Sequence, residues 1–298
     1  MAAPSTLCAS MILPSQLVEN CQKAPERKIW LSTLPQLLDK VVALWSLRLE
    51  TPFQNGGTCS WVCPVVRFDG THAVLKLAMP HMEGKHEIQG LRYWSGRSMV
   101  KLIEADADSG AMLMERCQPG TTLRSKPEPA QDGIIAGVLR RIWESTTATP
   151  GLADFRHLSQ MIDFWCEETI AQTHLWPDAG LVNEGLRVMK ELARPAPADV
   201  LLATDLHAGN VLRAQREPWL AIDPKPFVGD RSYDPVQHLM NCEARLHLKP
   251  TSLVERIADL TGVDPERLRL WTFARAAADP RDDWTNTRWI EIAKALSP

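Results

Sequence analysis

The 298-residue sequence lacks the marks of several large protein classes. It has no apolar run long enough to cross a membrane, and residues 1–17 have no basic region before their weak apolar patch, so no membrane span or signal peptide is predicted. The formal net charge of -3 provides no excess of basic residues for binding nucleic acid. We therefore expect a soluble cytoplasmic protein without a nucleic-acid or membrane partner.

The seven cysteines are odd in number and scattered, which argues against a disulfide framework. Cys59 and Cys63 would share one face of a strand near His72, but no second ligand pair has the spacing of a metal site. Small buried thiols are the favoured interpretation. The hydrophobic content of 45% and charged content of 23% predict an ordinary globular protein of one large or two modest domains.

Hydrophobic periodicity divides the chain into a β-rich and an α-rich part. Helical spacing over 26–49 is followed by two apolar segments joined by Asp69-Gly70, which predict a hairpin. The predicted strands are 59–68, 71–78, 99–103 and 111–115, and a helix over 84–97 lies between the second and third of them. The helices predicted after these strands are 133–145, 158–174, 185–194, 235–246, 252–260 and 264–278. The sequence thus predicts an α+β fold with a small β-rich lobe (1–116) and a larger α-rich lobe (117–298).

Two short segments carry most of the chemical information. Residues 204–210 are Thr-Asp-Leu-His-Ala-Gly-Asn, and residues 222–226 are Ile-Asp-Pro-Lys-Pro. The apolar residues on both sides of a turn at 215–218 predict a hairpin, which would bring Asn210 and Asp223 together at one end. The amide and carboxylate oxygens of these two residues suit Mg²⁺.

A third oxygen donor, Asp205, lies just before this hairpin and would accept or orient the proton of a substrate hydroxyl. Metal ligands beside such a carboxylate are the equipment of phosphoryl transfer. The ordered set of Asp-x4-Asn, a short hairpin and Ile-Asp-Pro is far more specific than a lone pair of carboxylates.

On these residues the chain resembles the aminoglycoside phosphotransferase family, which has a protein-kinase-like fold, and especially its streptomycin 6-kinase and hydroxyurea phosphotransferase branch. The matching motifs are at 205–212, 221–226, 229–230 and 233–235, with weaker matches at 73–76 and 114–116. The resemblance implies a two-lobed, ATP- or GTP-dependent and Mg²⁺-dependent kinase of a small antibiotic hydroxyl, and hence antibiotic resistance. In one departure, Ala203-Thr204 stands where the family usually has His-Gly.

Lys76 is a candidate for binding nucleotide phosphate. It lies in the apolar run 73–77, where a buried lysine must pair with an anion or reach water. Glu83 and Glu87 are one helical turn apart and either would hold the amine; Glu87 is favoured because Gly84 interrupts the start of the helix. The alternative is an edge-strand lysine on a solvated face.

Two further segments are candidates for contacts with the nucleotide. Gly56 and Gly57, within 55–58, would offer backbone N–H groups to phosphates, although an ordinary hairpin turn is equally consistent. The resemblance places the interlobe hinge at Glu115 to Cys117, whose backbone would bind the base; the alternative is simply the end of a strand.

Three residues around the central motif are expected to support it. His207 is expected to make a structural hydrogen bond rather than to transfer a proton. By the resemblance Asp234 braces the catalytic loop, and it is equally suited to cap a helix beginning at Pro235. Lys225 would neutralise phosphate charge or lie at the surface between two prolines.

The substrate site is the least defined part of the prediction. The candidates for an acidic pocket that binds a cationic antibiotic are Asp279, Asp282, Asp283, Glu167 and Glu168. Solvated faces are the alternative for these carboxylates. Trp271 and Trp284 would contact a flat substrate or pack in the core.

The leading hypothesis is a kinase of a small antibiotic such as streptomycin, acting as a monomer or dimer. A kinase of another small hydroxyl metabolite or of a peptide antibiotic is an alternative within the same class. A nucleotide-binding pseudokinase that serves as a binding module is an alternative from a different class, and Ala203-Thr204 keeps it open.

Overall fold

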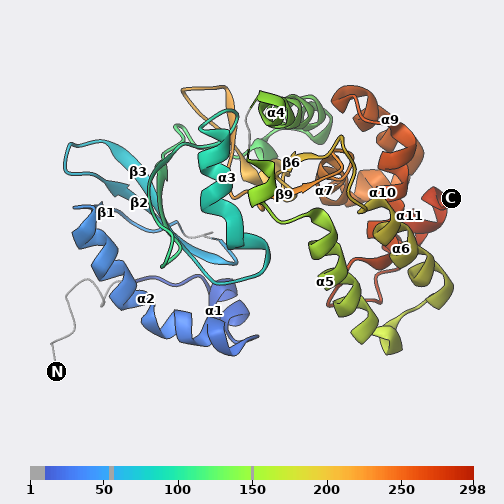
Figure 1. Cartoon of the computed structure of the whole chain (residues 1–298), viewed down its shortest axis with the longest axis horizontal. Helices are drawn as coiled ribbons and strands as arrows, with labels where there is room; N and C mark the ends of the chain where they lie inside the picture. Colours follow the sequence, from blue (N-terminus) through green and yellow to red (C-terminus); the bar gives the residue numbers. More distant parts are fainter. Residues whose placement is uncertain (1–10, 54–56, 149–150) are drawn as a thin grey trace. The chain divides into compact units, whose positions relative to one another are not determined.

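The computed structural model describes residues 11–53, 57–148 and 151–298, and it divides into two compact units, Met1–Gln118 and Pro119–Pro298 (Figure 1). The first unit contains a five-stranded sheet, and the second consists mainly of helices. The predicted α+β composition, with strands concentrated in the first part of the chain, is therefore present.

The first unit is built on an antiparallel sheet whose strands are ordered β1-β2-β3-β5-β4. Its elements are α1 (Ser15–Cys21), α2 (Pro25–Leu44), β1 (Arg48–Leu49), β2 (Ser60–Val66), β3 (His72–Ala78), η2 (Glu83–His86), α3 (Glu87–Trp94), β4 (Leu102–Asp106) and β5 (Ala111–Glu115). In β3, Leu75 and Leu77 are fully buried in one cluster with Leu34 and Leu38 of α2. Because side chains alternate along a strand, Lys76 lies on the opposite face of the sheet.

The boundaries of the first unit differ from the prediction at two places. The predicted helix over 26–49 ends at Leu44, and β1 follows it. The strand predicted at 99–103 lies at Leu102–Asp106, where pairing with β5 through an irregular register sets its position. A short apolar run does not define a strand register, because the pairing partner does.

The second unit packs its helices around α10. The helices are α4 (Glu128–Ala148), α5 (Leu158–Ala171), α6 (Ala179–Leu192), α7 (Asp234–Asn241), α8 (Glu243–Leu248), α9 (Pro250–Thr261), α10 (Pro265–Ala278) and α11 (Thr287–Leu296), and the short 3-10 turns are η3 (Leu123–Ser125), η4 (Leu152–Asp154), η5 (Thr173–Leu175) and η6 (Ala208–Asn210). Small side chains let α6 approach α10 closely, since a Cβ at Gly185 would lie 2.7 Å from the Cβ of Ala277. Helix α11 was not predicted from the sequence.

Two small antiparallel sheets are nested in the second unit. The inner pair, β7 (Val211–Arg213) and β8 (Trp219–Ala221), is the hairpin that the sequence predicts. In the outer pair, β6 (Val200–Leu202) precedes this hairpin in the sequence and β9 (Phe227–Gly229) follows it. The two loops that join the outer pair to the inner pair, 203–210 and 222–226, therefore meet at one junction, and they contain both motifs singled out above.

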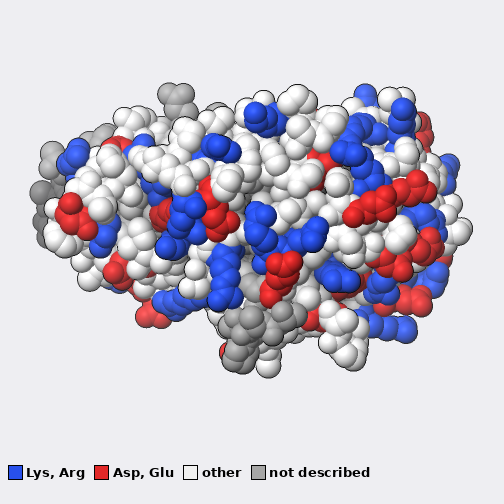
Figure 2. Space-filling view, turned by 90° about the horizontal axis from the view of Figure 1, so that it is seen from above, with Lys and Arg blue, Asp and Glu red and all other residues white. Residues whose placement is uncertain are grey.

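The surface charge is mixed. On the face shown in Figure 2, Lys and Arg side chains are interspersed with Asp and Glu side chains. This agrees with the near balance of 33 basic and 36 acidic residues. None of the helices in the described ranges combines the length and the apolar character that a membrane span requires.

Candidate active site

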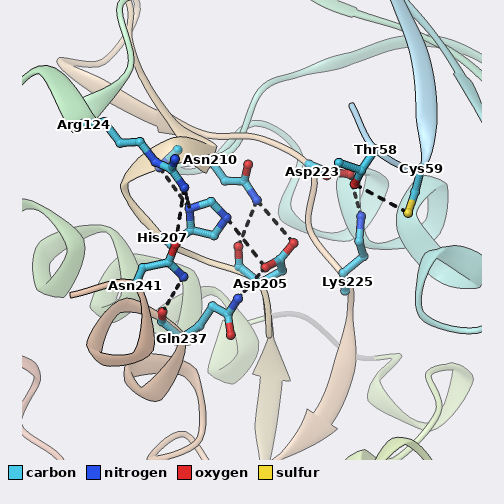
Figure 3. Close-up of polar contacts among 11 residues, drawn as sticks. Thr58, Cys59, Arg124, Asp205, His207, Asn210, Asp223, Lys225, Gln237 and Asn241 are labelled. Carbon is cyan, nitrogen blue, oxygen red and sulfur yellow. Dashed lines mark hydrogen bonds and ion pairs between the residues drawn. The ribbon is translucent and has the colours of Figure 1, made fainter. Parts of the chain in front are cut away.

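Two side-chain amides hold the carboxylate of Asp205 in the 203–210 loop (Figure 3). Gln237 Nε2 donates to its Oδ1 at 2.9 Å, and Asn210 Nδ2 approaches its Oδ2 at 3.4 Å. The same Asn210 nitrogen donates to the Asp205 carbonyl oxygen at 3.0 Å. The Asp205 side chain is 30% exposed, so a hydroxyl group can reach this carboxylate.

The hairpin brings Asn210 and Asp223 to the same end. The N–H of Ile222 donates to the carbonyl oxygen of Asn210 at 2.9 Å, and Asp223 is the next residue. Because the amide nitrogen of Asn210 faces Asp205, its amide oxygen faces away from that residue. An amide oxygen and a carboxylate are donors that suit Mg²⁺, which commonly takes one or two protein ligands and completes its shell with phosphate and water.

Lys225 forms an ion pair with the predicted metal ligand Asp223. Its Nζ donates to Asp223 Oδ1 at 2.7 Å, and the residue is only 6% exposed. A surface position for Lys225 is therefore wrong. The ammonium group therefore lies against the carboxylate that the sequence predicts as a Mg²⁺ ligand.

Asp234 braces the loop that carries Asp205. This fully buried carboxylate accepts from Thr204 N at 2.7 Å, from Ala203 N at 3.2 Å and from Trp143 Nε1 at 2.8 Å. Burial raises the pKa of Asp234 to about 6, although the three donors act in the opposite direction. Asp234 is also the first residue of α7, so the carboxylate connects this helix to the loop.

Thr204 ties the two loops to one another. It has φ of +50°, in the left-handed region where glycine is the usual residue. Its Oγ1 donates to the carbonyl oxygen of Lys225 at 2.6 Å, and Lys225 N donates to the Ala203 carbonyl oxygen at 2.9 Å. The absence of the family's His-Gly pair therefore does not leave the Asp205 loop without support.

His207 has the geometry of a structural hydrogen-bond acceptor. Its Nδ1 accepts from Gly209 N at 3.0 Å, while its Nε2 lies 3.8 Å from Asp205 Oδ1, too far for a hydrogen bond. Burial, with a contribution from Arg124, lowers the pKa of His207 to about 4, so the ring is neutral near pH 7. A Cβ at Gly209 would lie 2.7 Å from His207 Cε1, which explains the glycine at that position.

In the first unit, Lys76 pairs with Glu87, the glutamate that the sequence favours over Glu83. Lys76 Nζ lies 2.5 Å from Glu87 Oε1, and the two side chains are 6% and 2% exposed. The edge-strand alternative is wrong, because β3 lies between β2 and β5. The ammonium group of Lys76 is therefore buried and held by a carboxylate from α3.

The other predicted nucleotide contacts are at the ends of strands. Gly56 lies outside the described residues, and Gly57 precedes β2, where a Cβ would lie 2.6 Å from Ser60 Oγ. Glu115 ends β5, and its Oε2 accepts from Lys101 N at 2.9 Å. Cys117 follows as a half-buried residue just before the division after Gln118.

Among the described residues there is no group of three or more His, Cys, Asp and Glu side chains that could hold a metal ion. A metal site at Cys59, Cys63 and His72 is accordingly not supported. The interpretation of the thiols as free cysteines agrees with Cys59, which is half-buried, and Cys63, which is buried.

The predicted aromatic substrate contact at Trp271 is wrong. Trp271 is fully buried, and its Nε1 donates to Asp230 at 2.8 Å, so it belongs to the core. Trp284 is likewise only 5% exposed and donates to Gln172 at 2.8 Å. With two hydrogen-bonded indoles inside the unit, core packing is the correct alternative for both residues.

The predicted acidic residues have separate environments. Asp279 Oδ2 accepts from Arg275 Nε at 2.9 Å in a largely buried pair, so its charge is compensated. Asp283 accepts from the N–H and hydroxyl of Thr285, whereas Asp282 is exposed. Glu167 and Glu168 lie exposed on α5. Because Arg275 already neutralises Asp279, the most buried of these carboxylates is not free to bind a cationic substrate.

Sequence reasoning missed the residues that reach the motif from other elements. Gln237 comes from α7, Arg124 from η3 and Trp143 from α4. A signal existed for Gln237, because it lies one helical turn after Asp234 and so on the same helix face. No comparable local pattern marks Arg124, whose Nη2 lies 3.5 Å from His207 Nδ1.

Comparison with known proteins identifies relatives along most of the chain. A family model described as aminoglycoside/hydroxyurea antibiotic resistance kinase matches residues 46–281. A streptomycin 6-kinase of Streptomyces glaucescens is 34% identical over 275 residues, which are 88% of each chain. A hydroxyurea phosphotransferase of Kitasatospora aureofaciens is 36% identical over 248 residues, which are 81% of this chain and 71% of that protein.

Solved structures of small-molecule kinases share the fold. A choline kinase of Streptococcus pneumoniae gives a TM-score of 0.58 at 17% identity, covering 89% of this chain and 99% of that one. A spectinomycin phosphotransferase in complex with ADP and spectinomycin gives 0.52 at 14% identity, covering 88% and 94%. These likenesses confirm the predicted two-lobed, protein-kinase-like fold.

Proposed function

Because this chain belongs to the aminoglycoside/hydroxyurea antibiotic resistance kinase family, we propose that it transfers the γ-phosphoryl group of ATP or GTP to a hydroxyl of an antibiotic. Membership confirms the resemblance stated from the motifs and makes the chain a phosphotransferase. Streptomycin is the first candidate substrate, since relatives named streptomycin 6-kinase align over most of the chain. Phosphorylation of the antibiotic would inactivate it and confer resistance.

The observation that carries this proposal is the arrangement of Asp205, Asn210 and Asp223 at one junction of two loops. Asp205 would accept a hydrogen bond from the substrate hydroxyl and orient it for in-line attack. Asn210 and Asp223 would hold Mg²⁺, which supplies positive charge to the phosphates when it is bound. Lys225, paired with Asp223, contributes a further cation.

Lys76 would bind the nucleotide phosphates. The Glu87 carboxylate fixes its ammonium group by a 2.5 Å contact, which keeps the long side chain in one position. Phosphoryl transfer depends on positioning and electrostatic stabilisation more than on covalent chemistry. A lysine that is fixed by Glu87 would supply positioning and positive charge, because its ammonium group is already oriented before the nucleotide binds.

The test is a transfer assay with ATP or GTP and Mg²⁺ over a panel of streptomycin, other aminoglycosides, hydroxyurea, peptide antibiotics, an amino alcohol and a simple sugar. Product is scored as the mass of one added phosphoryl group. We expect a phosphorylated antibiotic, with streptomycin first. A product formed only from an amino alcohol or sugar would show a metabolite kinase, and nucleotide binding without any transfer would show a binding module.

Replacement of Asp205 tests the catalytic assignment. Asp205→Ala should lower kcat by about a hundredfold to ten-thousandfold, the range for loss of a general base. Nucleotide binding, followed by thermal shift with and without Mg²⁺, should be largely retained. Asp259→Ala is the matched control, because Asp259 is an exposed aspartate on α9. Equal turnover in Asp205→Ala and Asp259→Ala would refute the assignment.

A further inference from the structure

Helix α7 contacts the Asp205 loop at two successive turns. Its first residue, Asp234, holds the backbone N–H groups of Ala203 and Thr204. One turn later, Gln237 extends its amide to the Asp205 carboxylate, and Figure 3 shows Gln237 and Asn210 both pointing toward that residue. The helix therefore fixes the loop backbone with one side chain and contacts the reactive side chain with the next.

We propose that Gln237 is a positioning residue that fixes the rotation of the Asp205 carboxylate, so that one of its oxygens faces the acceptor hydroxyl. The inference rests on the proposed function, in which Asp205 orients that hydroxyl. A carboxylate turns readily about its last side-chain bond, because that torsion has broad wells. A directional donor on one oxygen removes this freedom.

The distances single out Gln237 for this role. Its Nε2 lies 2.9 Å from Asp205 Oδ1, whereas Asn210 Nδ2 is 3.4 Å from Oδ2 and donates better to the Asp205 carbonyl. His207 Nε2 is 3.8 Å away from Oδ1. Asn210 must also keep its amide oriented for the predicted metal, so among these three contacts the one from Gln237 is best suited to orient the carboxylate.

Gln237 is itself held in place by its surroundings. Asn241 Nδ2 donates to the Gln237 carbonyl oxygen at 2.9 Å, one turn further along α7. Arg124 Nη2 in turn donates to Asn241 Oδ1 at 3.3 Å. The role also requires an amide side chain at position 237. The N–H of an amide donates to the Asp205 carboxylate, whereas the negative charge of a glutamate would repel that carboxylate.

In the full-length protein, the test compares Gln237→Leu, Gln237→Glu and the control Asn183→Leu, a change at an exposed asparagine on α6 whose amide donates to the Ala179 carbonyl oxygen of the same helix. A misplacement of about 1 Å near a reacting group costs on the order of a hundredfold in rate, so we expect kcat for antibiotic phosphorylation to fall about tenfold to a hundredfold in both Gln237 variants. The KM for nucleotide should stay unchanged. Asn183→Leu removes a side-chain amide from a helix surface but leaves the donor to Asp205, so its kcat should be close to that of the wild type.

The split between kcat and KM separates positioning from a structural role. A parallel loss of kcat, nucleotide affinity and melting temperature in Gln237→Glu, which keeps the side-chain shape, would overturn the proposal. An unchanged kcat in Gln237→Glu would overturn it as well, even where Gln237→Leu is unstable. If Asp205→Ala lowers kcat as expected while both Gln237 variants keep the wild-type kcat, only the inference on Gln237 fails. If Asp205→Ala keeps the wild-type kcat, the proposed function of Asp205 fails.

Discussion

Replacement of Asp234 by asparagine should test how the Asp205 loop is held. The carboxylate is fully buried and accepts three hydrogen bonds, one on Oδ1 from Thr204 N and two on Oδ2 from Ala203 N and Trp143 Nε1. In Asp234→Asn one of the two positions becomes an N–H donor. If the amide oxygen keeps the two bonds at Oδ2, the new amide group faces the N–H of Thr204.

The magnitude follows from two opposing terms. A buried donor left without a partner costs about 1–3 kcal/mol, and here two donors face each other, so the loss is about 2–6 kcal/mol. Removing the buried negative charge offsets part of this loss. Burial raises the pKa of Asp234 from 3.8 to about 6, which corresponds to about 3 kcal/mol at neutral pH. The net change expected near pH 7 therefore runs from a stabilisation of about 1 kcal/mol to a destabilisation of about 3 kcal/mol.

The same pKa makes the effect depend on pH. Since the folded-state pKa lies above the ordinary value, the folded wild type binds more protons than the unfolded chain between about pH 4 and pH 6. Its free energy of unfolding therefore falls as the pH rises through this window. The asparagine variant has no such proton, so its deficit in stability should be larger near pH 4 than near pH 7, by up to about 3 kcal/mol.

Urea denaturation of wild type and Asp234→Asn over this pH range measures the difference, with the exposed Asp259→Asn on α9 as the control. Transfer assays on the same variants measure whether the Asp205 loop still supports catalysis. The kcat of Asp234→Asn should fall, because the N–H of Thr204 loses its acceptor. The reasoning is refuted if the stability difference between wild type and Asp234→Asn is the same at every pH. It is also refuted if kcat is unchanged.

Three further replacements probe other contacts. Lys76→Met removes the ammonium partner of the buried Glu87 carboxylate, so the free energy of unfolding should drop by about 3–5 kcal/mol in denaturant titrations. The double variant with Glu87→Gln should regain stability but not nucleotide affinity, and recovery of both would contradict the role of Lys76 in binding phosphate. Thr204→Val removes the hydroxyl that donates to the carbonyl oxygen of Lys225 in the other loop. The free energy of unfolding should fall by about 0.5–1.5 kcal/mol and kcat should fall as well. An unaltered kcat would show that catalysis does not need this hydrogen bond. Trp271→Phe leaves Asp230 without the indole donor and should lower the melting temperature with an unchanged KM for antibiotic; a selective rise in that KM would restore the discarded substrate contact.

Local patterns predicted the parts of the site that lie close together in sequence. The turn at 215–218 between two apolar runs predicted the β7–β8 hairpin and so the neighbourhood of Asn210 and Asp223. The outer pair β6–β9 was missed, because strands of three residues are too short to show a period of two. Lys76 and Glu87, eleven positions apart, were paired correctly because each lies on an element with a clear periodicity.

Contacts between segments that are distant in the sequence were not predicted. Gln237 is 32 residues from Asp205, and Trp143 is 91 residues from Asp234. Trp271 shows that the sequence also left the burial of a side chain undecided. Its sequence context suits both a binding surface and a core, and only the packing of α10 buries it against Asp230.

The sequence by itself determined the oxygen donors Asp205, Asn210 and Asp223, their order, and the family to which they belong, because spacing along a short hairpin is a local property. Only the tertiary structure decided how those donors are held. Asp234 and Gln237 reach the loop from α7, and Thr204 replaces a missing His-Gly pair by bonding across to Lys225. Hydrogen bonds of this kind act over about 3 Å, so they depend on how distant segments pack and not on their separation in the chain.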